Sequence, residues 1–471
     1  MSWPAAVLWV LMIAAVLSRG PSLLYLLMIT GAFGSLQMLP FSGGVNLLPQ
    51  SACAALFVCK ALVQRGNITR GIESALDPQR MILFTTFIGY GVFGAVILPR
   101  AFLGLLEVVP ISAPISGTDI LRPSSGNYTQ SCYLMLSYGT ALTFSIIGQS
   151  ASLRRHYRLA LVWAAYVLFL TGVVDLITYS LHIGSVLEPF RTATYSFLVD
   201  VEAEGAKRVV GLMPEASTFG TACAGLMASL IYLRPLYEKG AEQTSVLVAI
   251  ALLGLMTILS TSATGLVGLG VLGLVYGADL VYRIFDTYNP RRAGLNFELA
   301  VLFLALFAVF AGIVMKPNLL DPVYSVIDGL LYEKTKSASY AERSMWTRIG
   351  WHAFLDTGGM GAGLGSIRVS NWAVSILGST GVFGALMMFG FIAQQLLTMP
   401  REAPKDVAVF STALKLSLLP TLSMYLVVST IPDIGVGAAS VLGLIAASHT
   451  PAPRPVPGPS PSSPVPVGGR A

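Results

Sequence analysis

The sequence predicts an all-α polytopic membrane protein of about 12–14 transmembrane helices, because charged residues are scarce and long apolar runs recur. Hydrophobic residues make up 54% of its 471 positions and charged residues only 11%, whereas a soluble globular chain has about 25% charged residues. The apolar runs approach 20 residues, about the length that crosses a hydrocarbon core. No alternating barrel pattern appears, so each span is expected to be helical, since backbone groups in lipid need internal hydrogen bonds.

The apolar runs between polar breaks define about thirteen predicted spans, of which the first three are short or interrupted. They cover residues 3–17, 22–40, 46–63, 81–99, 132–149, 159–180, 218–235, 245–261, 264–282, 297–315, 371–398, 408–428 and 433–448. Residues 1–448 are therefore expected to form one transmembrane domain. The proline-rich segment 449–471 is predicted to be a disordered cytoplasmic tail.

Basic residues gather in alternate short connections, and this asymmetry predicts the orientation of the spans. These residues are Arg19, Lys60, Arg65, Arg70, Arg80, Arg154, Arg155, Arg158, Arg234, Lys239, Arg283, Arg291, Arg292, Arg401 and Lys405. The net charge of +6 is thus interpreted as a topology signal on the cytoplasmic side, and no nucleic-acid partner is expected. Three long connections, at about 99–131, 181–217 and 316–370, then face outward, and an extracytoplasmic site is favoured because loops on a rigid scaffold carry function.

The connection 316–370 is the first candidate site, because it concentrates charge in a chain that otherwise avoids it. Its charged residues include Lys316, Lys334, Lys336, Arg343, Arg348, Arg368, Asp321, Asp328, Glu333, Glu342 and Asp356. Residues 340–355 have apolar side chains at helical spacing, which predicts an amphipathic helix at the membrane surface. Arginine is suited to bidentate phosphate binding, so Arg343 and Arg348 are candidate anion ligands. Interfacial anchoring by snorkelling is the alternative for both.

Three further segments could contribute to the same outer site. Glycines at 358, 359, 361, 363 and 365 predict either a backbone that presents N–H groups to an anion or a tight turn between helices. Glu215 lies at the outer boundary of a span, where a carboxylate is costly to bury; it is a functional candidate or a helix N-terminal acid. The polar break 260–265 (STSATG) could satisfy its own turn or bind a ligand.

The remaining ionisable residues give weaker signals. His182 and His352 are predicted to face outward and are candidate bases. No HExxH motif, zinc-ligand spacing or phosphate-binding P-loop occurs, and residues 199–202 (VDVE) resemble an acidic metal pair only loosely. No metal and no cofactor are therefore predicted.

Taken in order, these motifs resemble those of the O-antigen polymerase and O-antigen ligase superfamily over roughly residues 208–385. The first is Arg208 with Gly211, Glu215 and Ser217-Thr218-Phe219, which is similar to the family's R-x-x-G-x-x-x-E-x-S-x-F pattern at the start of a span. The others are the polar break 260–265, the outer loop with Arg343, Trp346 and its glycine turn, and Ser370-Asn371 followed by Gly381 and Gly384. Each motif is short, so the resemblance depends on their order.

The resemblance implies a GT-C-like architecture and a metal-independent glycosyltransferase on the periplasmic face of a bacterial inner membrane. The donor would be a glycan on polyprenyl diphosphate, such as undecaprenyl diphosphate, and the acceptor another lipid-linked repeat, giving a surface or secreted polysaccharide. Chain-length regulator and export proteins would be partners. Arg343 and Arg208 would bind the diphosphate, with Arg191 and Arg348 as weaker seconds and Ser370 and Asn371 as further substrate contacts.

One departure from the family pattern bears on the acceptor. The family's ligases typically carry a histidine immediately before the asparagine, where this chain has Ser370. This favours a polymerase over an O-antigen ligase or protein O-oligosaccharyltransferase with the same donor, and leaves Glu215 as first candidate base and His352 as second. A lipid-linked glycan flippase or transporter is the other alternative, although transporters usually show internal repeats and charges at the membrane centre, and no clear repeat is found here.

Overall fold

The structure is a computed structural model. It describes residues 1–40, 46–111, 117–194, 197–198, 202–203, 206–286, 290–292, 294–316, 338–399 and 403–449. Helices dominate these residues, and the strands among them form two short antiparallel hairpins. The predicted all-α class is confirmed.

The α-helices are α1 (Trp3–Leu17), α2 (Ser22–Ile29), α3 (Pro49–Leu62), α4 (Asn67–Leu76), α5 (Ile82–Ala101), α6 (Ser125–Ile147), α7 (Ala151–Ser180), α8 (Ala216–Leu233), α9 (Ala241–Leu259), α10 (Ala263–Phe285), α11 (Leu295–Met315), α13 (Ala338–Asp356), α14 (Trp372–Leu397), α15 (Lys405–Val428) and α16 (Gly435–Ala447). Short 3-10 helices are η1 (Thr30–Ala32), η2 (Gly184–Phe190), η3 (Arg234–Leu236) and η4 (Pro290–Arg292). Strand β1 (Glu107–Val108) pairs with β2 (Asp119–Ile120), and β3 (Glu202–Ala203) with β4 (Ala206–Lys207).

Eight helices of the described chain are long and apolar enough to cross a membrane, namely α5, α7, α8, α9, α10, α11, α14 and α15. The protein is therefore a multi-pass membrane protein. Helices α1, α3 and α16 are apolar but shorter, as is α2 together with η1. Each predicted span contains one α-helix, and α13 covers the predicted helical segment 340–355. Of the thirteen predicted spans, five correspond to helices outside this set of eight, namely α1, α2, α3, α6 and α16.

Three predicted span boundaries lie more than four residues from the helix end that the structure shows, and one of them is the start of the span 159–180, whose helix α7 begins at Ala151. The span 22–40 stops being helical after Ala32, because the chain beyond it pairs with outer connections: the Ser35 N–H donates to the Leu212 carbonyl at 2.9 Å, and the Ser35 carbonyl accepts from Thr192 at 3.0 Å. The span 132–149 begins earlier, at Ser125, because Ser124 and Asn127 form a capping box that satisfies the first N–H groups of α6. The first turns of α6 consist mostly of polar residues, so hydrophobicity alone does not reveal where this helix begins.

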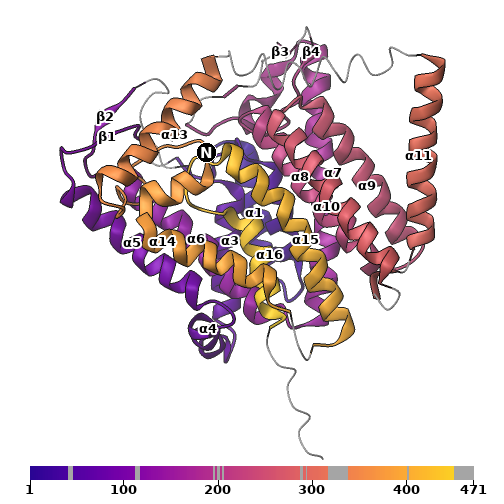
Figure 1. Ribbon diagram of the computed structural model, residues 1–471, viewed down its shortest axis with the longest axis horizontal. Coiled ribbons are helices and arrows are strands. Elements are labelled where there is room, and N and C mark those ends of the chain that lie inside the picture. The colour runs from indigo at the N-terminus through magenta and orange to yellow at the C-terminus, as the bar shows by residue number, and fades with distance from the viewer. Residues whose placement is uncertain are drawn as a thin grey trace, which may run out of the picture.

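Both hairpins and α13 lie at one end of the helical bundle, and α4 lies at the opposite end (Figure 1). We call these the outer and inner ends. Within the bundle, helices α8 and α10 pack closely at small residues. A Cβ atom on Gly265 of α10 would lie 3.2 Å from the Cα atom of Gly220 on α8. Backbones approach this closely only where both helices present small residues.

A small second apolar core binds the outer elements to one another. Its buried members come from the β1–β2 hairpin, α13 and the chain that follows α13, and they are Leu106, Val108, Leu121, Ala353, Ala362, Ile367 and Val369. The Arg368 guanidinium lies 5.2 Å from the ring centroid of Trp346, and the Arg368 N–H donates to the Val109 carbonyl at 2.7 Å. The predicted outer connections 99–131 and 316–370 therefore pack together.

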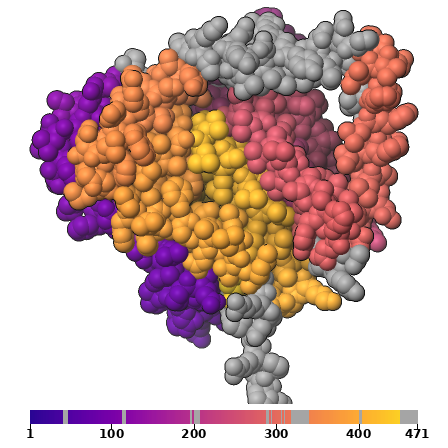
Figure 2. All heavy atoms as spheres, in the orientation of Figure 1, coloured from indigo at the N-terminus to yellow at the C-terminus, as the bar shows by residue number. Residues whose placement is uncertain are grey.

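Helix α11 stands at the margin of the bundle (Figures 1 and 2), and most of its described side chains are exposed. A buried ion network holds its inner end. Glu298 accepts hydrogen bonds from Arg283 at 2.6 Å, from the Tyr276 hydroxyl at 2.9 Å and from Arg234, while Asp279 pairs with Arg283 at 2.9 Å and with Arg291 at 2.8 Å. Three basic residues of the predicted cytoplasmic loops are thus part of a buried network.

Candidate functional site

Three predicted site residues meet at the outer end, where α8 begins. Glu215 is the N-cap residue of α8, and its Oε1 atom accepts a hydrogen bond from the Ser217 hydroxyl. Its Oε2 atom lies 4.0 Å from Nη2 of Arg343 on α13. The side chains of Glu215 and Arg343 are 29% and 36% exposed, so this contact is open to solvent and within reach of a ligand.

Arg208, the third member, is held by the break between α9 and α10. Its Nε atom donates to Thr261 Oγ1 at 3.1 Å and its Nη2 atom to the Thr261 carbonyl at 3.4 Å. Burial lowers the pKa of Arg208, the Glu215 carboxylate raises it, and the Arg343 charge lowers it again. The charges of Glu215 and Arg343 therefore both act on Arg208, and we call these three residues the Arg208–Glu215–Arg343 cluster.

The polar break 260–265 serves its own turn and also positions Arg208. Ser262 caps α10 by accepting a hydrogen bond from the Gly265 N–H at 3.3 Å. Thr261 has φ of 44°, a left-handed conformation that is uncommon for a β-branched residue. Thr261 accepts two of the hydrogen bonds that Arg208 donates, so its backbone conformation helps to position Arg208.

Asp175, near the outer end of α7, is a site residue that sequence reasoning missed. Its side chain is fully buried. Its Oδ2 atom accepts from the backbone N–H groups of Val210 at 2.9 Å and Gly211 at 3.2 Å, and its Oδ1 atom pairs with Arg191 at 3.0 Å and Lys207 at 2.9 Å. Asp175 thus fixes the segment that leads from Arg208 to Glu215. The sequence signal that could have identified Asp175 is a single acidic residue within an apolar span.

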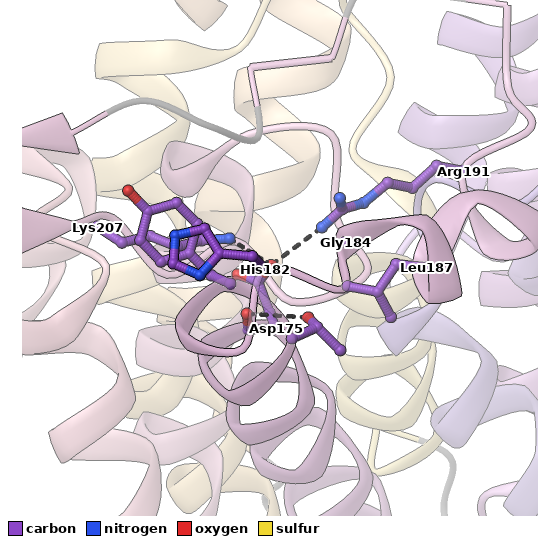
Figure 3. A pocket seen from close by; sticks show the side chains of 8 residues that line it. Asp175, His182, Gly184, Leu187, Arg191 and Lys207 are labelled. Atoms are coloured by element: carbon purple, nitrogen blue, oxygen red, sulfur yellow. Dashed lines mark hydrogen bonds and ion pairs between the residues drawn. The ribbon is translucent and has the colours of Figure 1, made fainter.

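The predicted diphosphate ligand Arg191 is committed to Asp175 and lies in a separate pocket of about 290 Å³ (Figure 3). In this pocket Arg191 and Lys207 reach Asp175 from two sides, and the Lys207 ammonium lies 4.6 Å from the ring centroid of Tyr179. The lining residues are Asp175, Thr178, Tyr179, His182, Gly184, Leu187, Arg191 and Lys207. Arg191 pairs with Asp175, and Asp175 holds the backbone of Val210 and Gly211. Arg191 therefore supports the segment between Arg208 and Glu215.

The glycine-rich segment after α13 forms a tight turn against α14. The N–H groups of Gly361, Ala362 and Gly363 donate to Thr357 Oγ1 at 2.8 Å, the Gly378 carbonyl at 2.7 Å and the Ser379 carbonyl at 3.0 Å. These donors are therefore used within the protein, which favours the turn over an anion cradle.

Helix α14 breaks where this turn meets it. Gly381 has φ of 65° inside α14, and a Cβ atom on Gly361 would lie 2.8 Å from the Gly381 nitrogen. The Asn127 side chain on α6 donates to the Leu364 carbonyl at 2.7 Å. Non-helical backbone within a membrane protein is tolerated where other parts of the protein surround it. Here the glycine turn is hydrogen-bonded to α6 and α14.

The predicted substrate contacts Ser370 and Asn371 lie at the start of α14. The Asn371 side chain accepts a hydrogen bond from the Val374 N–H at 3.1 Å and so caps the helix, while Ser370 is buried. The adjacent Trp372 ring N–H donates to the Pro432 carbonyl at 3.1 Å. In the described part of the chain, no hydrogen bond or ion pair joins Ser370 or Asn371 to the cluster.

Arg348 and His352 share α13 with Arg343 but are exposed and point elsewhere. At about 100° per residue, His352 lies about 180° around the helix from Arg343 and Arg348 about 140°. Neither residue forms a hydrogen bond or ion pair with the residues that the structure describes. The structure thus brings Arg343 alone of these three to Glu215.

Asp433 is a second acid that sequence reasoning missed. It lies between α15 and α16 in the connection that carries Pro432, and its Oδ1 atom is buried without a hydrogen-bond partner. Burial raises the pKa of Asp433 to about 6, against the lowering effect of hydrogen bonds from Ser137 and two backbone N–H groups. A buried acid with a raised pKa is a candidate functional group.

Several predicted residues lie outside the described chain, namely Asp321, Asp328, Glu333, Lys334, Lys336, Arg401 and the tail from residue 450 onward. Among the described residues, no three His, Cys, Asp or Glu side chains gather as a metal ion requires. No family model matches the chain, and no curated protein matches it.

Proposed function

We propose that this protein is a glycosyltransferase that joins lipid-linked glycan repeats. Its substrates are oligosaccharides on polyprenyl diphosphate at the periplasmic face of a bacterial inner membrane, and its product is a surface or secreted polysaccharide. The Arg208–Glu215–Arg343 cluster carries this proposal, because it joins residues from distant segments at the outer end of a membrane bundle.

The chemistry requires stabilisation of negative charge and a proton acceptor, and the cluster contains groups suited to both roles. An acceptor hydroxyl oxygen forms a bond to the anomeric carbon of the donor while the bond from that carbon to the diphosphate oxygen breaks. Negative charge develops on the departing diphosphate, and guanidinium groups stabilise such charge through paired hydrogen bonds. The proton of the acceptor hydroxyl passes to a carboxylate within reach, a role that we assign to Glu215.

The two arginines have different parts in this scheme. Arg208 is half-buried and held by Thr261, so it offers a preorganised charge. Arg343 contacts Glu215 only at 4.0 Å and is the more exposed, so it can turn to the diphosphate without loss of a strong protein contact. Ser370, in the place of the ligase histidine, favours a lipid-linked acceptor repeat and hence polymerisation.

The proposal is tested by deleting the gene and analysing the glycans on the carrier lipid. Single repeats on the outer leaflet are expected. Finished polymer stranded there would indicate a ligase, and single repeats held on the inner leaflet would indicate a flippase.

The role of the cluster is tested by Arg343→Ala, with Arg348→Ala on the same helix as the matched control. We expect Arg343→Ala to reduce polymer at least tenfold at normal protein level, since a charge-assisted contact to the transition state contributes about 2–4 kcal/mol. Arg348→Ala should leave polymer unchanged. Equal polymer from both variants would remove Arg343 from the mechanism.

A further inference from the structure

Helix α4, between α3 and α5, turns its apolar side chains away from the protein. Ile68, Ile72 and Leu76 are 61%, 58% and 60% exposed. The buried residues of this helix are instead Asn67, Gly71 and Ser74. A helix on the surface of a soluble protein shows the opposite arrangement, so these three apolar side chains need an apolar surrounding that the described part of the chain does not provide. We call them the α4 stripe.

The side chains of α4 fall into three sectors around its axis. At about 100° per residue, the α4 stripe spans an arc of about 80°. The exposed charges Arg70 and Glu73 are centred about 130° from the stripe on one side, and the buried residues about 130° from it on the other. A helix with one side on protein, one on lipid and one in water requires this three-way division.

Hydrogen bonds fix which side of α4 faces the protein. Ser74 Oγ lies 2.7 Å from Ser145 Oγ on α6, and the Asn67 side chain donates to the Ala61 carbonyl at 2.8 Å. The Thr85 hydroxyl on α5 donates to the Ala75 carbonyl at 2.8 Å. These contacts come from α3, α5 and α6, so α4 cannot rotate to bury its stripe.

The position of α4 places the stripe at the level where the spans end. Helix α3 ends at Leu62 and α5 begins at Ile82, with α4 between them, and Figure 1 shows α4 almost end-on at the inner end, across the direction of α11. Arg65 and Arg70 are exposed beside it, at a level where basic side chains reach lipid phosphates.

We propose that α4 lies in the plane of the inner-end leaflet, with the α4 stripe in the acyl region and Arg70 and Glu73 in water. The occupant of the stripe is phospholipid, because the stripe is apolar and exposed where the helices α3 and α5 end and begin, and has a charged sector opposite it. A protein partner or a second copy would require no such division. The surface belongs to the inner end, far from the cluster, and does not depend on the proposed function.

Nitroxide scanning of the full-length protein in nanodiscs of phosphatidylethanolamine and phosphatidylglycerol tests this. The exposed native cysteines are removed as Cys59→Ser and Cys132→Ser, while Cys53 and Cys223 are buried. Single labels are placed through Ile68→Cys, Ile72→Cys and Leu76→Cys, with Arg70→Cys and Glu73→Cys as controls on the same helix. Collision with oxygen reports lipid, and collision with a water-soluble nickel chelate reports water.

We expect the oxygen-to-nickel collision ratio to be at least fivefold higher at the three stripe positions than at the two controls. A stripe ratio equal to that of the controls would place the stripe in water and overturn the proposal. Stripe labels shielded from both reagents would indicate a protein partner or a second copy and would overturn it as well. All five positions are exposed, so the labels are expected to leave the fold intact.

Discussion

Asp175 shows how one buried side chain organises the outer site. It accepts hydrogen bonds from two backbone N–H groups and pairs with two cations, Arg191 and Lys207. The Lys207 side chain is only 5% exposed, so its charge depends on Asp175 for compensation. Loss of one partner of a buried pair leaves an uncompensated charge and is costly.

We therefore expect Asp175→Asn to lower the free energy of unfolding by about 3–5 kcal/mol and to lose polymer synthesis. Thermal unfolding in detergent measures the first effect. Asp119→Asn is the control, since Asp119 pairs with Arg122 in the open, with side chains 42% and 72% exposed, and should cost less than about 1 kcal/mol. Equal melting temperatures for the two variants would contradict the role of Asp175.

Asp433 predicts a pH dependence of stability. Because burial raises its pKa from 3.8 to about 6, the folded state binds more protons than the unfolded state between these values. Stability therefore falls as the pH rises from about 4 through about 6, and the loss is complete above that range.

Asp433→Asn removes the ionisation, so its melting temperature should exceed that of the wild type at pH 7.5. The difference should shrink as the pH is lowered towards 4. A constant difference across this range would show that Asp433 is not the group that titrates.

At the scale of elements, the turn after α13 and the break in α14 form one unit. Gly365 has φ of 81°, and a Cβ atom there would lie 2.2 Å from the Gly126 carbonyl oxygen on α6. The nearest atoms are backbone atoms of α6, so a Cβ atom on Gly365 could not be accommodated by the movement of a side chain. The turn carries the end of α13, and with it the helix that presents Arg343.

Gly365→Ala is accordingly expected to destabilise the protein by several kcal/mol through both the clash and the left-handed φ. Gly273→Ala is the control, because Gly273 lies within α10 with nothing within 4 Å of a Cβ atom, and alanine is the better helix former. Melting temperatures in detergent should fall for the first variant and hold or rise for the second. A Gly365→Ala variant as stable as Gly273→Ala would exclude this packing.

At the scale of the whole molecule, α11 is attached to the bundle mainly through ions at its inner end. Glu298 joins α11 to Arg283 of α10 and Arg234 of η3. The apolar side chains along the rest of α11 are largely exposed. The position of α11 therefore depends on one carboxylate more than on side-chain packing.

Glu298→Gln should leave the buried guanidinium groups undercompensated and free α11 from α10. We expect the distance between labels on α10 and α11, measured by pulsed electron spin resonance in nanodiscs, to broaden markedly. Glu242→Gln is the control, since Glu242 pairs with the half-exposed Arg155 on other helices. An unchanged, narrow distance distribution in Glu298→Gln would show that packing alone holds α11.

Much of the fold could be predicted from the sequence, because hydrophobicity along the chain is a local property. Each predicted span contains a helix, and α13 occupies the segment that apolar spacing indicated. Of the proposed site residues, Glu215 and Arg343 lie 4.0 Å apart, and both of their charges act on Arg208. The span 22–40 was predicted too long, because the backbone partners of Ser35 lie far away in the sequence. The start of α6 was predicted too late, because a local capping box of Ser124 and Asn127 begins the helix among polar residues.

The sequence by itself determined the membrane class, the helices and the segments that could carry a site, since each follows from the composition of a short stretch. Only the tertiary structure decided which charges are free to act. Arg191 is bound to Asp175, Arg348 and His352 point away from Glu215, and the N–H groups of the glycine turn donate to Thr357 and to carbonyls of α13 and α14. The physical reason is that burial and pairing depend on how the helices pack, which brings Arg191 back onto Asp175 of α7 and brings Arg343 of α13 to Glu215 at the start of α8.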